Sequence, residues 1–200
     1  MKKVFCIGFH KTGTNSLGTA LEHLGYRVCG VQFELLPSLE RKDFVQLIEI
    51  ANSYDAFKDN PWPLLYKELD VLFPGSKFIF TIRDDKKWIR SVVNHFNSTP
   101  SEMLQHVYGK PYPEGNEKLY LDTYRNHNQD VVTYFAGRTN DFLILDLESE
   151  TAWQDLCAFL HKPVPDIPFP FINKGAYSVF EKLSRKINRL KRGLMRRLGL

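Results

Sequence analysis

The sequence predicts a three-layer α/β/α fold in which helices cover both faces of a central parallel sheet. Short apolar runs rich in strand-forming residues recur along the 200 residues, and the clearest are residues 4–9, 77–82 and 142–146. Segments with helical spacing separate these runs, which is typical of parallel sheets. Because ligands of such sheets bind beyond the carboxyl ends of the strands, we expect the functional residues at that edge.

The remaining elements are placed by their start and stop signals. Gly25 follows the last residue of a helical pattern, where glycine is favoured, and Ser38 after Pro37 is a typical N-cap. We expect strands over residues 4–9, 26–29, 54–58, 77–82 and 142–146, the last one buried. We expect helices over residues 14–24, 38–51, 64–73, 86–96, 102–107, 118–135 and 151–160. Residues 97–116 are rich in proline and glycine, and a stretch of this kind is usually a lid or a binding loop.

The first strand leads into a loop of small polar residues and then into a helix, which is the arrangement that binds phosphate. Gly8 and Gly13 have the separation of a Walker A motif, but Thr14 stands at the lysine position and Asn15 stands where a hydroxyl residue would hold magnesium. Lys11 supplies a positive charge inside the loop instead. The loop therefore keeps an anion cradle without the usual metal site.

Residues 11–17, KTGTNSL, resemble the 5′-phosphosulfate loop of sulfotransferases that use 3′-phosphoadenosine 5′-phosphosulfate (PAPS), with His10 in place of a common proline. The resemblance spans most of residues 3–175 and implies a P-loop NTPase-like fold with PAPS as donor, 3′-phosphoadenosine 5′-phosphate (PAP) as product and no metal. It also implies a set of donor-binding residues in the loop: Lys11, Thr12, Gly13, Thr14, Asn15 and Ser16. The alternative is a strand–helix turn with incidental small residues.

A second motif follows the strand at residues 77–82. In the resembled family an arginine at this strand end and a serine eight residues later bind the 3′-phosphate, and Arg83 and Ser91 have that spacing. A planar guanidinium suits a phosphate because it can donate two parallel hydrogen bonds. The alternative for Arg83 is an ion pair with Asp84, Asp85 or another surface carboxylate.

Two further assignments rest on the resemblance. Lys174 and Gly175 look like a reduced version of the family's late loop over the 3′-phosphate; the alternative is a solvated lysine. The family's general base comes from the turn after residues 54–58, where this chain has no histidine, so Asp59 is the candidate and Lys58 would neutralise the leaving group beside Lys11. Asp59 acting only as an Asx-turn or helix cap is an equal alternative.

Other residues have more ordinary interpretations. His10 either touches the transferred group or shapes the loop, and Trp62 and Trp88 are expected in the core. Cys6 and Cys29 fall in predicted strands, so buried free thiols in a reducing compartment are expected.

The charge is distributed unevenly along the chain. Net charge is +4, but residues 181–200 hold eight Lys and Arg against Glu181 alone, a net +7 that leaves −3 for the rest. The pI therefore gives no reason to expect a nucleic-acid partner. We expect a domain over residues 1–178 and a basic amphipathic helix over 179–200, either lying on an anionic membrane through residues 182–198 or packed on the domain. With no signal peptide or spanning segment recognised, a cytoplasmic location, with possible contact at the membrane surface, is the default.

The sequence thus predicts an enzyme that moves a sulfuryl group from PAPS to a hydroxyl or amine of a small-molecule, glycan or lipid acceptor. A divergent P-loop kinase of small molecules and a non-catalytic nucleotide-binding or membrane-docking module are the alternatives. The acceptor and the oligomeric state have no signature in the sequence.

Overall fold

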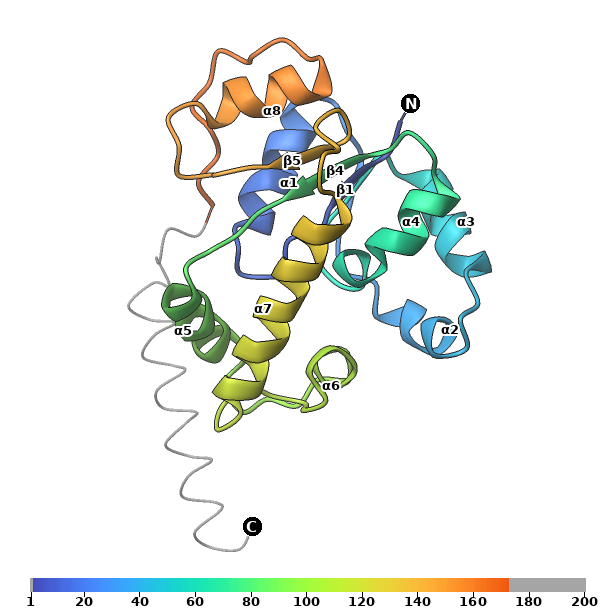
Figure 1. Ribbon diagram of the computed structural model, residues 1–200, viewed down its shortest axis with the longest axis vertical. Coiled ribbons are helices and arrows are strands. Elements are labelled where there is room, and N and C mark those ends of the chain that lie inside the picture. The colour runs from blue at the N-terminus through green and yellow to red at the C-terminus, as the bar shows by residue number, and fades with distance from the viewer. Residues whose placement is uncertain (1, 173–200) are drawn as a thin grey trace, which may run out of the picture. The chain divides into compact units, whose positions relative to one another are not determined.

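The computed structural model describes residues 2–172, and at their centre lies a sheet of five strands in which every pair is parallel (Figure 1). The strand order is β2-β3-β1-β4-β5, and Val4 lies opposite Ala56 on one side and Lys77 on the other. The strands are β1 (Val4–Cys6), β2 (Val28–Cys29), β3 (Ala56–Phe57), β4 (Lys77–Phe80) and β5 (Phe142–Ile144). The predicted parallel sheet with helices on both faces is confirmed.

Eight α-helices and two short 3₁₀ segments connect the strands within the described residues. The 3₁₀ segments are η1 (Phe33–Leu35) and η2 (Trp62–Leu65). The helices are α1 (Thr14–His23), α2 (Leu36–Glu40), α3 (Val45–Ser53), α4 (Tyr66–Leu72), α5 (Asp85–Phe96), α6 (Glu102–Tyr108), α7 (Glu117–Tyr134) and α8 (Ala152–Leu160). No helix among the described residues is long and apolar enough to span a bilayer.

Each face of the sheet has its own apolar core because successive side chains of a strand point to opposite faces. Val4 and Cys6 of β1 pack with α1 and α8, whereas Phe5 and Ile7 pack with α3, α4 and α7. Figure 1 shows α1 and α8 beside one face of the strands and α3 and α4 beside the other. A strand that is buried on both sides reads as a continuous apolar run, which explains the sequence of β1.

A third core lies beyond the carboxyl ends of the strands and joins α5, α6 and α7. Trp88 of α5 stacks on Tyr124 of α7 with ring centroids 4.1 Å apart, and Tyr108 of α6 stacks on Tyr120 of α7 at 3.8 Å. Phe9, which follows β1, belongs to the same cluster. This core fixes α5 and the segment containing α6 against the loop that follows β1.

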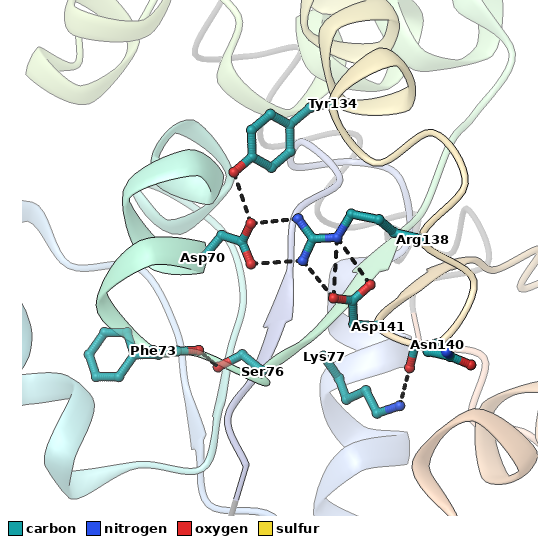
Figure 2. A network of polar contacts seen from close by, with 8 residues as sticks. All are labelled: Asp70, Phe73, Ser76, Lys77, Tyr134, Arg138, Asn140 and Asp141. Atoms are coloured by element: carbon teal, nitrogen blue, oxygen red, sulfur yellow. Dashed lines mark hydrogen bonds and ion pairs between the residues drawn. The ribbon is translucent and has the colours of Figure 1, made fainter.

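The opposite edge of the sheet is tied together by an ion-pair network around Arg138 (Figure 2). The guanidinium Nη2 donates to Asp70 at 2.9 Å and to Asp141 at 2.5 Å, and Tyr134 donates to Asp70 at 2.8 Å. Lys77 reaches the carbonyl of Asn140 nearby. The network joins α4 to the end of α7 and to the start of β5.

Two expectations about elements were wrong. The single helix expected over residues 38–51 is two helices, with Lys42 between them at φ 55°, and Ser38 is a buried residue inside α2 whose hydroxyl donates to Gln46 at 3.2 Å. The strand expected to be buried at residues 142–146 is an edge strand with Ile144 52% exposed, because it pairs with β4 alone. Cys6, Cys29 and Cys157 are buried free thiols, as expected for the first two.

Candidate active site

The residues predicted to act lie on the loops that follow three neighbouring strands. Lys11 and Gly13 follow β1, Asp59 follows β3, and Arg83 follows β4, and in a parallel sheet these strand ends share one edge. Because β1 lies between β3 and β4, the glycine-containing loop is flanked by the candidate base on one side and by the candidate phosphate ligand on the other.

The loop after β1 depends on two glycines. A Cβ atom on Gly8 would lie 2.4 Å from the Thr81 carbonyl oxygen of the neighbouring strand connection, so the two backbones touch. Gly13 has φ 101°, and a Cβ atom there would lie 2.4 Å from the Leu147 side chain. The Thr12 hydroxyl lies 2.6 Å from the Phe9 carbonyl and 2.7 Å from the Thr81 hydroxyl, which closes the loop on itself.

The loop leads directly into the start of α1. Gly13 is the N-cap residue of this helix and therefore offers no side chain to the first turn. The first N–H groups of a helix have no helical acceptor, and together with the helix dipole they favour an anion. Thr14 and Ser16 are buried in this turn and Asn15 is exposed. The turn can accept a phosphate or sulfonate oxygen.

Lys58 connects the base side of the site to the loop. Its ammonium group donates to the Asp59 carboxylate at 2.7 Å and to the Asn15 side-chain oxygen at 2.9 Å. Its aliphatic stem crosses Gly18, where a Cβ atom would lie 2.7 Å from Lys58 Cδ. Asp59 has φ 63°, and its carboxylate faces Lys58 rather than capping the following 3₁₀ segment, which has no side-chain cap.

Arg83 is attached to the loop by its side chain and to α7 by its backbone. Its Nη1 donates to the Lys11 carbonyl at 3.1 Å, and the Tyr124 hydroxyl both accepts from the Arg83 N–H and donates to its carbonyl, each at 2.9 Å. Asp84 caps α5 and Asp85 pairs with Arg125, so neither of these two acids holds the guanidinium. The guanidinium is therefore attached to the loop rather than to either of these acids.

The other predicted ligands have different positions. Ser91 is half-buried in α5, one helical turn beyond Trp88, and its part in binding remains a prediction. Lys174, Gly175 and the basic segment 179–200 lie outside the described residues.

His10 is a structural residue that joins the loop to the segment at residues 97–116. It is 8% exposed, its Nε2 lies 3.1 Å from the Tyr108 hydroxyl, and its carbonyl accepts from Trp88 Nε1 at 2.9 Å. Burial lowers the pKa of His10 to about 4, and the positive charge of Lys11 acts in the same direction against Asp59. The imidazole is therefore neutral at neutral pH.

Three residues that support the loop escaped sequence analysis. These are Thr81, Tyr124 and His127. His127 Nε2 lies 2.8 Å from the Ile7 carbonyl, which can only accept, and its ring stacks on Phe9 with centroids 4.0 Å apart. Burial lowers the pKa of His127 to about 4. Thr81 is a polar residue at the end of an apolar strand, and that contrast was the one signal in the sequence.

The arrangement defines an α/β domain whose opening strand–loop–helix unit lies between basic and acidic groups from the neighbouring strands. The sulfotransferase domain family matches residues 3–108 and 93–177, and the chain belongs to this family. It is also similar to a protein of Aspergillus versicolor named Ava biosynthesis cluster protein M, with 23% identity across 85% of this chain and 80% of that protein.

Proposed function

We propose that the protein is a PAPS-dependent sulfotransferase that transfers a sulfuryl group to a hydroxyl or amine of a small molecule. The family supports the reaction class. The name of the Aspergillus relative refers to a biosynthesis cluster, which favours a small-molecule acceptor over a glycan or a lipid.

The residues at the loop fit a donor that carries phosphate and sulfonate groups. Gly8 and Gly13 allow the loop to pack against Thr81 and Leu147, and Lys11, Lys58 and Arg83 supply positive charge around it. Lys11 and the first turn of α1 would hold the 5′-phosphosulfate, while Arg83, with Ser91, would hold the 3′-phosphate. PAPS supplies the sulfuryl group and a phosphate leaving group.

Different residues of the chain would then stabilise the leaving group and accept the proton of the acceptor. Lys11, Lys58 and the helix start would stabilise negative charge on the leaving phosphate, which is the electrostatic role that fixed donors perform in many enzymes. Asp59 would take the proton of the acceptor, since its carboxylate lies at the neighbouring strand end. Lys58 touches both Asn15 of the loop and Asp59, so one ammonium group would align the two halves of the reaction.

The observation that carries the proposal is the attachment of Arg83 to the Lys11 carbonyl at 3.1 Å. It fixes the candidate ligand of the 3′-phosphate to the loop that would bind the 5′ end. A donor with a 3′-phosphate and a 5′-phosphosulfate on one ribose would then contact both Arg83 and the loop that contains Lys11.

The test compares PAP with AMP, which lacks the 3′-phosphate, by calorimetric titration of the full chain. We expect PAP to bind at least about tenfold more tightly than AMP, and we expect Arg83→Ala to remove most of that difference, since charged hydrogen bonds contribute about 1.5–3 kcal/mol. Arg90→Ala, which alters an exposed arginine of the adjoining helix, is the matched control and should keep the difference. Equal affinity for PAP and AMP in the unaltered protein would contradict the proposal.

A further inference from the structure

The segment at residues 97–116 and the region around α2 line an open cavity that contains none of the candidate donor-site residues. It has a volume of about 840 Å³, which lies in the range of small-molecule sites. One wall contains Phe33 and Leu36, and the other contains Pro100 and Glu102 at the start of α6. Figure 1 shows α2 and α6 as neighbouring helices on the side of the molecule away from α8.

Each wall is joined to one side of the candidate active site. Gln32, which precedes η1, donates its N–H to the Asn60 carbonyl at 3.1 Å, next to Asp59. Tyr108 at the end of α6 lies 3.1 Å from His10, next to Lys11. A molecule held between the two walls would therefore lie between segments anchored to the candidate base and to the loop.

The lining of the cavity has a distinct chemistry. Glu34 and Glu40 on one wall and Glu102 on the other are carboxylates, and none of the described lining residues is a lysine or an arginine. Phe33 is 55% exposed, so its ring is available to cover an apolar ligand in the cavity. The charge is opposite to that of the donor side, where Lys11, Lys58 and Arg83 gather.

From this lining we propose that the acceptor is an amphipathic cation: a small molecule with an apolar, aromatic-sized body and a protonated amine. The inference rests on the proposed function in taking the cavity as the acceptor site. The carboxylates would bind the amine and Phe33 would cover the apolar body, leaving a hydroxyl of the same molecule to be the nucleophile. That hydroxyl would lose its proton to Asp59 as its oxygen bonds to sulfur and the bond from sulfur to the leaving phosphate oxygen breaks.

The test uses three phenols that share a para-ethylphenol body and differ in the charged group that it carries. These are tyramine, para-ethylphenol and para-hydroxyphenylpropionate, which are cationic, neutral and anionic. Dissociation constants for the full chain are measured by ligand-observed NMR. We expect tyramine to bind at least about tenfold more tightly than the propionate, the factor that one good charged contact supplies.

The variant Glu34→Gln/Glu102→Gln removes one carboxylate from each wall and should reduce the preference for tyramine to less than about threefold. Glu49→Gln, which alters an exposed residue of α3 that does not line the cavity, is the control and should keep the full preference. An equal or reversed order among the probes, no binding of any probe, or a preference that survives the double substitution would overturn the inference.

PAP affinity is measured in the same proteins, so that the two proposals are tested separately. If the charge preference holds but PAP does not bind, the cavity is a site for cations and the proposed donor is wrong. If PAP binds but the probes show no charge preference, the donor proposal stands and the inference about the acceptor fails.

Discussion

Lys58 is the residue that connects the two sides of the candidate site. Its ammonium group lies 2.9 Å from the Asn15 oxygen and 2.7 Å from Asp59, and both contacts require the stem to cross α1 at Gly18. Only a residue without a side chain leaves that path open. Gly18 therefore leaves space for the Lys58 stem in a helix interior, where glycine otherwise costs about 0.5–1 kcal/mol relative to alanine.

Gly18→Ala should weaken PAP binding without lowering the stability of the fold. The new methyl group would displace the flexible Lys58 stem rather than the backbone, so we expect unfolding to need slightly more urea while PAP binds about tenfold more weakly. The measurements are a urea denaturation curve and a PAP titration. Thr19→Ala, one residue further along α1, is the control and should leave PAP affinity unchanged; equal PAP affinity in both variants would show that Lys58 does not depend on this path.

At the scale of elements, the segment at residues 97–116 is anchored rather than loose. Met103, Leu104 and Tyr108 of α6 are buried, and Tyr108 both stacks on Tyr120 and contacts His10. The helix and the loop after β1 therefore form one packed unit. A movement of α6 would displace His10 and, with it, the adjacent Lys11.

Tyr108→Phe should weaken this unit without altering its shape. Loss of the hydroxyl removes the partner of a buried His10 nitrogen, and we expect the free energy of unfolding to fall by about 1–2 kcal/mol. The measurement is the urea midpoint at neutral pH. Tyr112→Phe, in the same segment at a half-buried position, should shift it by less than about 0.5 kcal/mol. Equal shifts in the two variants would contradict the assigned role of the His10 contact.

The sequence predicted elements well where local signals and packing agree. The order of strands and helices follows from apolar runs and glycine stops, and the expected positions of Lys11, Asp59 and Arg83 on loops after strands are confirmed, while their roles remain predictions. The break between α2 and α3 was missed because Lys42 adopts a left-handed conformation, which a lysine in the sequence does not predict. Tyr124 and His127 were missed because their partners are backbone groups far away in the sequence.

At the scale of the molecule, the edge of the sheet where the strands begin and the edge where they end have different roles. The edge where the strands begin is closed by Arg138 and its carboxylate partners (Figure 2). Hydrogen bonds from Arg138, and also from Tyr134, hold the pKa of Asp70 below its usual value. The edge where they end carries the glycine loop and two neutral histidines, the buried His10 and the half-buried His127. As pH falls from neutrality, protonation of groups at the site edge therefore lowers stability before protonation of groups at the opposite edge does.

Unfolding free energy should fall as pH is lowered from 7 to 5. His10 and His127 have folded pKa values of about 4, below the ordinary 6.5, so the unfolded chain binds more protons between these values. Each histidine should contribute about 2 kcal/mol of loss over this range. The depressed pKa of Asp55, about 2, acts only at lower pH, as stability lost when pH falls below 3.8. Urea denaturation at both pH values is the measurement, and a constant or rising free energy would contradict the buried neutral state.

The measurement that tests the account most directly is a calorimetric titration of the full chain with PAP in the presence of EDTA, beside a titration with ATP and Mg²⁺. The loop has Thr14 at the Walker lysine position and positive groups from Lys11, Lys58 and Arg83 around it, so PAP should bind tightly without metal. Addition of Mg²⁺ should not strengthen PAP binding, and ATP with Mg²⁺ should bind far more weakly. Binding of ATP with Mg²⁺ but not of PAP would contradict the account and favour a divergent kinase.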